Sequence, residues 1–214
     1  MFEKFLKRIN NFFMGNKSGL EMQTSEGHLG GYIVGKPAPG TWCPGIWDMF
    51  VEEYTVKSVL DVGCGLGYAL DYFRGLGCNV QGIEGSPTAI ENNQLIDSII
   101  EHDFTTGALI PDNWFDLVWS AEFVEHVEER FVDNFLAAFS KSKKFVAITF
   151  ATPGQGGYHH VNEQPGEYWI NKLDKIGFSY NESITSKARS LVPSEGKVGK
   201  QFRNKGLIFI RNKY

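Results

Sequence analysis

A short stretch at residues 58–67 constrains the fold of this chain more than any other. Its sequence, SVLDVGCGLG, is an apolar run that reaches Asp61 and then passes into glycines at positions 63, 65 and 67. The apolar run predicts a buried strand over 57–62, and residues 68–76 predict a helix that glycines stop. Alternate glycines let the backbone come close to a ligand because no Cβ intrudes. Such a loop lies at the carboxyl end of a strand, where open α/β sheets bind ligands.

A second acid follows about 20 residues later, which is the usual distance for a ribose-binding carboxylate. Glu84 ends the next predicted strand, 78–83, and its carboxylate can accept hydrogen bonds from both ribose hydroxyls. Dinucleotide folds use Gly-x-Gly-x-x-Gly, whose last glycine admits a pyrophosphate. Here Gly67 comes one residue early and Tyr68 takes the dinucleotide position. Asp61 adds negative charge, which suits a ligand with an ammonium and a sulfonium. The pattern therefore favours an adenosyl amino acid over NAD.

Predicted strands and helices alternate along the rest of the chain. Helices are expected from Pro44, over 86–93, 131–140 and 167–176; strands or apolar runs are expected over 98–100, 115–120, 144–150, 178–184 and 206–210. This alternation predicts a mainly parallel sheet with right-handed crossovers.

Several motifs together resemble the class I S-adenosylmethionine-dependent methyltransferases. VLDVGCGLG followed by GIEGSP is similar to motif I and the acidic loop of that family. Asp103 in EHDFTT stands where the family places an acid that accepts from the adenine amino group, with the Phe104 N–H facing the ring. FDLVWSAEFVEHV resembles motif IV in the Glu-His variant common among small-molecule methyltransferases, with Glu125 and His126 as the pair. GLIFIRN fits the reversed last strand, so the resemblance covers about 55–214.

The resemblance implies a Rossmann-like α/β fold: a seven-stranded, mostly parallel sheet with helices on both faces and an antiparallel last strand. It implies an enzyme that binds S-adenosylmethionine through residues 55–214 and transfers its methyl group by in-line displacement, so positioning and desolvation carry most of the catalysis. Residues 1–54 are expected to form an N-terminal helix and a substrate-capping lid, because this fold usually adds its lid before the first strand. The predicted cofactor-binding residues are Asp61, Gly63, Cys64, Gly65, Glu84, Gly85, Asp103, Phe104 and Ser120.

A hydroxyl or amine acceptor benefits from a general base, and we expect that base among Glu122, His126, His159 and His160. The adjacent histidines 159 and 160 lie in a Gly-rich loop, and at most one is expected to face the methyl group because neighbouring side chains point in different directions. His126 has an alternative reading as a packed or helix-capping residue. With Glu163 nearby, a metal site is a further alternative, but no tight His/Asp spacing supports it and no metal is predicted. Aromatic residues are candidates for the acceptor wall or for core packing: Tyr32, Trp42, Trp47, Tyr158 and Trp169.

The expected acceptor is a small molecule or a glycan-like molecule, methylated on oxygen or nitrogen. Lys and Arg number 21 against 25 Asp and Glu, a net charge of -4, so a broad basic face for nucleic acid is not expected. The Asn/Asp-Pro-Pro-Tyr motif of amino-methyltransferases that act on nucleic acid is absent. Three alternatives remain: a nicotinamide-dependent oxidoreductase, a methyltransferase-like binding module without turnover, and an RNA or protein methyltransferase.

Composition indicates the cellular setting. The three cysteines, without a Cys-x-x-Cys pair, fit a reducing compartment, and a cytoplasmic location is expected. No run approaches the roughly 20 apolar residues of a membrane span. The first residues carry phenylalanines at helical spacing without the unbroken apolar core of a signal peptide. Nothing in the pattern predicts the oligomeric state.

Overall fold

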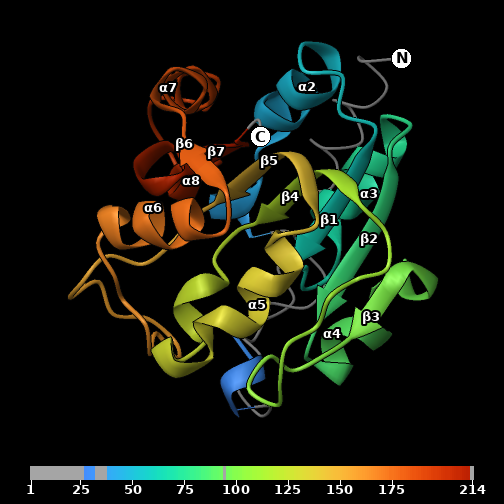
Figure 1. Ribbon diagram of the computed structural model, residues 1–214. Helices are drawn as coiled ribbons and strands as arrows, with labels where there is room; N and C mark the ends of the chain where they lie inside the picture. The colour runs from blue at the N-terminus through green and yellow to red at the C-terminus, as the bar shows by residue number, and fades with distance from the viewer. Residues whose placement is uncertain (1–26, 32–37, 94, 213–214) are drawn as a thin grey trace.

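The computed structural model describes residues 27–31, 38–93 and 95–212. Within these ranges the strands form one seven-stranded sheet in the order β3-β2-β1-β4-β5-β7-β6 (Figure 1). The strands β3, β2, β1, β4 and β5 are parallel, whereas β7 runs antiparallel to both β5 and β6. The predicted fold class, including the reversed last strand, is confirmed. The strands are β1 (Ser58–Val62), β2 (Asn79–Glu84), β3 (Ile99–Glu101), β4 (Phe115–Ser120), β5 (Ser142–Ile148), β6 (Phe178–Tyr180) and β7 (Leu207–Arg211).

Strand order reverses at β1, which pairs with β2 on one side and with β4 on the other. The Ser120 hydroxyl at the end of β4 donates a 2.8 Å hydrogen bond to the Val62 carbonyl at the end of β1. Ligands of doubly wound sheets bind at such a reversal, outside the carboxyl ends of the strands. The fold thus places the glycine loop after β1 beside the Glu-His loop after β4.

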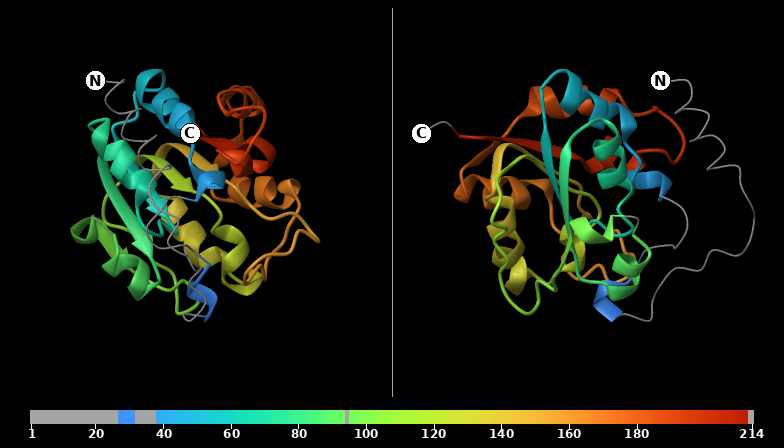
Figure 2. Two further views of the ribbon diagram at one scale, coloured as in Figure 1. Left: turned by 180° about the vertical axis from the view of Figure 1, so that it is seen from behind. Right: turned by 90° about the vertical axis from the view of Figure 1, so that its right-hand side faces the viewer.

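Helices cover both faces of the sheet, and two apolar clusters mark the faces. Along β7, Leu207 and Phe209 join the cluster with α5 and α6, while Ile208 joins the cluster with α2, α3, α7 and α8. This alternation is the period of two expected for a strand buried on both sides. Figure 2 shows the same layers from two further sides. The helices are α2 (Pro44–Glu52), α3 (Tyr68–Gly75), α4 (Pro87–Glu91), α5 (Val132–Phe139), α6 (Gly166–Lys175), α7 (Glu182–Ser190) and α8 (Lys200–Lys205).

Most element boundaries lie within two residues of their predicted positions, and one segment requires a correction. The apolar segment 178–184 is not one strand, because β6 ends at Tyr180 and the Asn181 side chain caps α7 by accepting from the Ile184 N–H at 2.8 Å. Helices α7 and α8 were not predicted from the sequence.

The tryptophans proposed as acceptor contacts are largely core residues. Trp47 and Trp169 are 1% and 0% exposed, and Trp42 packs edge-on against Trp47 with ring centroids 5.0 Å apart. Tyr32 lies outside the described residues. Aromatic burial of this kind stabilises the fold, and among the described members of that group Tyr158 lies beside the site.

The segment before β1 is described only in part, since residues 1–26 and 32–37 of the predicted lid lie outside the described ranges. Its described pieces are residues 27–31 and 38–54. The first contains the 3-10 helix η1 (Gly27–Leu29), which lies at the carboxyl edge of the sheet, far from α2 in the second (Figure 1). Among the helices that the structure describes, none combines the length and apolar character needed to cross a bilayer.

Candidate active site

The glycine loop after β1 forms one wall of an inner cavity at the reversal point. Gly63, Gly65 and Gly67 have φ values of +72°, +52° and +74°, a region that favours glycine. A Cβ on Gly65 would meet nothing within 4 Å, whereas one on Gly63 would lie 2.3 Å from the Phe123 ring. The predicted backbone approach to a ligand therefore has open space at Gly65, while Gly63 is required for packing against the loop after β4.

Glu84, at the end of β2, is tied to the glycine loop by backbone amides. Its carboxylate accepts hydrogen bonds from Gly65 N at 2.6 Å and from Gly85 N and Ser86 N at 2.9 Å. Charge-assisted bonds of this kind fix a carboxylate strongly. Glu84 and Gly85 both line the inner cavity, as the sequence predicts for a ribose site.

Three of the predicted cofactor residues lie behind the cavity wall rather than in it. Asp61 is 4% exposed, and its pKa is raised well above its usual range, first by burial and second by the charge of Glu84. The Cys64 N–H donates to the Ile83 carbonyl at 3.2 Å, and burial raises the pKa of its thiol, which argues against a reactive cysteine. Ser120 is occupied by its bond to Val62. These residues support the wall, and a cationic ligand group near Asp61 would offset its buried charge.

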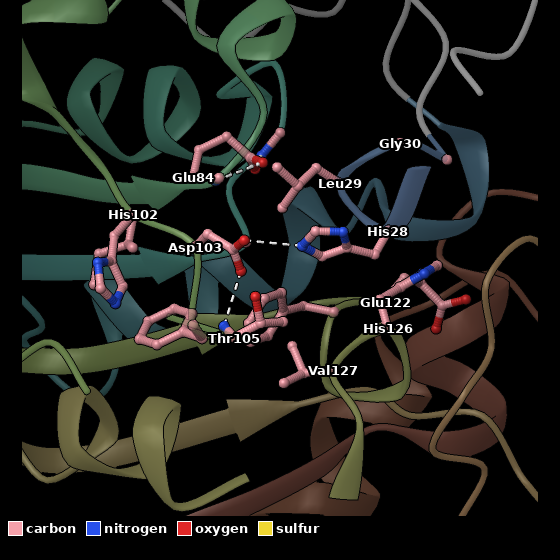
Figure 3. A pocket seen from close by; sticks show the side chains of 17 residues that line it. His28, Leu29, Gly30, Glu84, His102, Asp103, Thr105, Glu122, His126 and Val127 are labelled. Carbon is pink, nitrogen blue, oxygen red and sulfur yellow. Dashed lines mark hydrogen bonds and ion pairs between the residues drawn. The ribbon is translucent and has the colours of Figure 1, made fainter. Parts of the chain in front are cut away.

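The far wall of the inner cavity carries Asp103 and residues that sequence reasoning missed. The His28 Nε2 atom of η1 lies 2.9 Å from the Asp103 Oδ2 atom, and Thr105 N donates to Asp103 Oδ1 at 2.8 Å (Figure 3). Burial raises the pKa of Asp103, but the hydrogen bonds from Thr105 and His28 outweigh it and lower the pKa overall. Leu29 lies between Glu84 and His28 in Figure 3, and a Cβ on Gly85 would lie 2.6 Å from its Cδ2. Within the N-terminal segment, η1 thus covers the cavity.

The loop after β4 closes the cavity with Glu122, Phe123 and His126. Glu122 has a φ of +53°, unusual for a non-glycine residue, and its Oε1 atom accepts from the Thr149 hydroxyl at 2.9 Å. Burial, followed by the charges of His160 and His159, lowers the pKa of His126 to about 4. His126 is therefore neutral at physiological pH and able to accept a proton, although its basicity is low.

Glu125, which is 0% exposed, lies behind this loop. Its carbonyl accepts from Val161 N at 3.0 Å and Asn162 N at 3.1 Å, so the loop after β5 is attached to the loop after β4. Burial, and second the charge of Glu122, raise the pKa of the Glu125 carboxyl well above its usual range. One ligand atom each from Glu125, His126 and His160 lies within 4.8 Å of the others.

A second, outer hollow adjoins the first. It is lined by Gly27, His28, Thr105, His126, Glu128, Arg130, Phe131, Tyr158 and His159. His28, Thr105 and His126 line both hollows, so they lie at the boundary between them. Of the predicted base candidates, Glu122 lines the inner hollow, His159 the outer and His126 both, whereas His160 lines neither.

Comparison with known proteins identifies the domain. Residues 60–144 match the family model described as "Methyltransferase domain". The probable chloroplastic tocopherol O-methyltransferase of Oryza sativa subsp. japonica is 30% identical over 129 residues, which cover 54% of this chain and 33% of that protein. The chain spans only about a third to two fifths of the length of the curated relatives it matches.

Solved structures agree on the fold. A TehB-like S-adenosylmethionine-dependent methyltransferase from Corynebacterium glutamicum superposes with a TM-score of 0.57 at 16% identity, covering 99% of this chain and 97% of that one. Magnesium protoporphyrin IX methyltransferase from Synechocystis, crystallised with bound S-adenosylmethionine, gives 0.56 at 14% identity, covering 78% of this chain and 76% of that one. These structures share the Rossmann-like fold of this chain. Residues 60–144 thus match a methyltransferase domain, and the chain has the fold of solved methyltransferases that use S-adenosylmethionine.

Proposed function

We propose that this protein transfers the methyl group of S-adenosylmethionine to an oxygen or nitrogen of a small-molecule or glycan-like acceptor. The observation that carries the proposal is the pair of adjoining hollows that share His126. The inner hollow has the residues that suit an adenosyl ligand, namely the open glycine loop, Glu84 and Asp103. The outer hollow then binds the acceptor, and the methyl group is transferred from the cofactor to the acceptor at the boundary between the two hollows.

In this reaction the acceptor atom attacks the methyl carbon in line with the sulfonium. The new bond from oxygen or nitrogen to carbon forms as the sulfur–carbon bond breaks, which leaves S-adenosylhomocysteine, and the acceptor proton is lost. Neutral His126 is placed to receive that proton, and His159 borders the acceptor hollow. Most of the rate enhancement comes from holding the two reactants in line and excluding water. Oxygen is the preferred acceptor atom, because the curated relatives are named O-methyltransferases.

The proposed roles of the segments follow from the same geometry. Residues 1–54 would cap the site, supported by the contacts of His28 and Leu29 with the cavity, and residues 55–214 would hold the cofactor. Limited proteolysis with and without S-adenosylhomocysteine tests the cap: protection within residues 1–54 is expected, and unchanged cleavage there would count against it. The free thiols of Cys43, Cys64 and Cys78 support a reducing location such as the cytoplasm.

Transfer of a tritiated methyl group from S-adenosylmethionine to a panel of phenols, catechols, sugars and amines tests the activity. We expect labelled product with at least one class and its loss in Glu84→Ala. Protein that binds S-adenosylhomocysteine yet labels no acceptor would favour the binding-module alternative instead. Protein that is folded and binds no S-adenosylhomocysteine would overturn the proposed function altogether.

A further inference from the structure

The cluster of Glu125, His126 and His160 contains buried polar atoms that have no hydrogen-bond partner among the described residues. Both carboxylate oxygens of Glu125 are buried and have no hydrogen-bond partner among the described residues. The Nδ1 atoms of His126 and His160 are also buried and also lack a hydrogen-bond partner among the described residues. Buried polar groups are normally paired, and leaving them unpaired costs folding free energy. Several such groups gathered at one place indicate a site that binds something.

The geometry of the cluster suits a single small cation. One ligand atom from each of the three residues lies within 4.8 Å of the others, and metal–ligand bonds of roughly 2.0–2.2 Å allow one ion to reach all of them after a small contraction. The two loops that supply the ligands are already joined through the Glu125 carbonyl. The cluster is therefore assembled by the fold and does not depend on one flexible segment.

Two further features surround the cluster. Glu122 and His159, which precede its two segments, have φ values of +53° and +48°, and such strain in non-glycine residues concentrates at functional sites. Glu163 Oε1 lies 3.6 Å from His160 Nδ1, and the Glu163 carboxylate is held by Gly154 N and Gly156 N at 2.7 and 2.6 Å. At 3.6 Å the His160–Glu163 contact is too long for a hydrogen bond, so His160 Nδ1 stays unpaired within the described part of the chain, and the fixed negative charge of Glu163 favours a cation at the cluster.

We propose that Glu125, His126 and His160 bind one first-row divalent transition-metal ion beside the transferred methyl group. Two imidazoles and one carboxylate are a donor set typical of Zn²⁺ and Fe²⁺ sites that keep open positions, whereas Mg²⁺ and Ca²⁺ prefer all-oxygen sets. The site replaces the expectation from sequence that no metal is bound. His126 places it at the boundary of the inner and outer hollows.

The role of the ion rests on the proposed function. An acceptor hydroxyl that occupies an open position of the ion is oriented towards the methyl group and is more easily deprotonated, because a bound cation favours the anionic oxygen. His126 then acts as a ligand of the ion and no longer as the proton acceptor. The oxygen–carbon bond forms as the sulfur–carbon bond breaks, and the hydroxyl proton leaves to solvent. The site thus points to an acceptor that binds through a hydroxyl oxygen.

Metal binding is tested on the full chain after removal of metal with a chelator. Co²⁺ is titrated in by calorimetry, and its visible absorption is recorded in parallel, because that spectrum distinguishes nitrogen and oxygen ligands from thiolates. Wild type is compared with His160→Ala, with Glu125→Gln, and with the matched control His102→Ala. His102 lines the inner hollow but lies outside the cluster, and its Nε2 atom lies 3.0 Å from the Gly107 carbonyl oxygen. Thermal unfolding confirms that each variant folds.

We expect one equivalent of Co²⁺ to bind wild type and His102→Ala alike, with a spectrum free of thiolate bands. His160→Ala and Glu125→Gln should each bind at least about 100-fold more weakly, since even residues behind the ligands change metal affinity about 10–100-fold. Absence of a saturable site in wild type, a thiolate spectrum, or unchanged binding in both folded cluster variants would overturn the proposal. The titration contains neither cofactor nor acceptor, so its failure leaves the proposed methyl transfer intact, and binding of S-adenosylhomocysteine tests that function separately.

Discussion

The buried acids on the two sides of the site differ in whether they have hydrogen-bond partners. On the cofactor side, which is the inner hollow with the glycine loop, Glu84 accepts from three backbone amides at 2.6–2.9 Å. On the acceptor side, which is the outer hollow with the cluster of Glu125, His126 and His160, Glu125 is 0% exposed. Both of its carboxylate oxygens lack a hydrogen-bond partner within the described part of the chain. The first side is organised by its own backbone before any ligand binds, because Gly65 of the glycine loop and Gly85 and Ser86 after β2 supply the donors. The second side keeps polar groups unpaired, which is the condition of a site whose partner comes from outside the chain.

The largest effect on stability is expected at Gly63, where the glycine loop packs against the Phe123 ring of the loop after β4. An alanine Cβ there would lie 2.3 Å from the Phe123 ring, at a φ of +72°. We expect Gly63→Ala to lower the free energy of unfolding by about 3 kcal/mol through overpacking and left-handed strain. Urea unfolding measures this, with Gly65→Ala as the matched control.

Gly65 has a similar φ of +52°, but a Cβ there meets nothing within 4 Å. Gly65→Ala should therefore lose only about 1 kcal/mol, from the backbone alone, while weakening S-adenosylhomocysteine binding. Equal losses at the two glycines would show that the Phe123 contact does not join the two sides.

Asp61 is an acid of the cofactor side whose charged form the protein disfavours. Because burial and Glu84 raise its pKa, wild type loses free energy of unfolding as the pH rises from 3.8 through the raised folded value. Asp61→Asn removes that loss, so at pH 7 the variant should be more stable by roughly 1 kcal/mol and bind S-adenosylhomocysteine more weakly. Unfolding and binding are measured across the pH range.

The control for Asp61→Asn is Asp116→Asn, at a buried aspartate that is paired. Asp116 Oδ2 accepts from Lys57 N at 2.9 Å, and its Oδ1 lies 3.5 Å from Lys144 Nζ. The same substitution should destabilise the protein there, because a charge-assisted contact is lost. A destabilised Asp61→Asn variant would show that the buried charge of Asp61 is already balanced in the apo protein.

The smallest effect on stability is expected at η1, which covers the inner hollow of the cofactor side. The His28–Asp103 pair is partly exposed, with side chains 38% and 23% accessible, so His28→Ala should change stability by less than about 1 kcal/mol. The contribution of Asp103 is present above 3.8 and is lost as the pH falls through its lowered folded pKa, so the difference from wild type should vanish at low pH. Stopped-flow dissociation of S-adenosylhomocysteine should be several-fold faster in the variant. An unchanged rate would show that His28 does not retain the ligand.

The cofactor side was largely predictable from the sequence because its chemistry is local. The glycines, Glu84 and Asp103 each follow a strand whose apolar run marks its end, and all of them line the cavity except Gly67. Asp61, Cys64 and Ser120 lie at or near the ends of the predicted strands but do not line the cavity, because sheet register and packing decide which side chains face it.

The acceptor side was not predictable in the same way because it is assembled from distant segments. His160 joins Glu125 and His126 only after β5 and its loop have folded back. The cover of the cofactor side is non-local in the same way, because His28 meets Asp103 across 75 positions. No short spacing marks either arrangement. Helices α7 and α8 were also not predicted. In α8 the periodic apolar pattern of a helix is missing, because only Phe202 of its six residues is buried.

The most direct test of two sites with separate tasks is calorimetric titration of S-adenosylhomocysteine into wild type, Glu84→Gln and His160→Ala under metal-free conditions. Glu84→Gln keeps the shape of the side chain but removes the charge that the amides and the ribose share. The account predicts a loss of affinity of about 10- to 100-fold for Glu84→Gln and a change of less than about threefold for His160→Ala. Comparable losses in both variants, or no loss in Glu84→Gln, would contradict the division of the site into a cofactor side and an acceptor side.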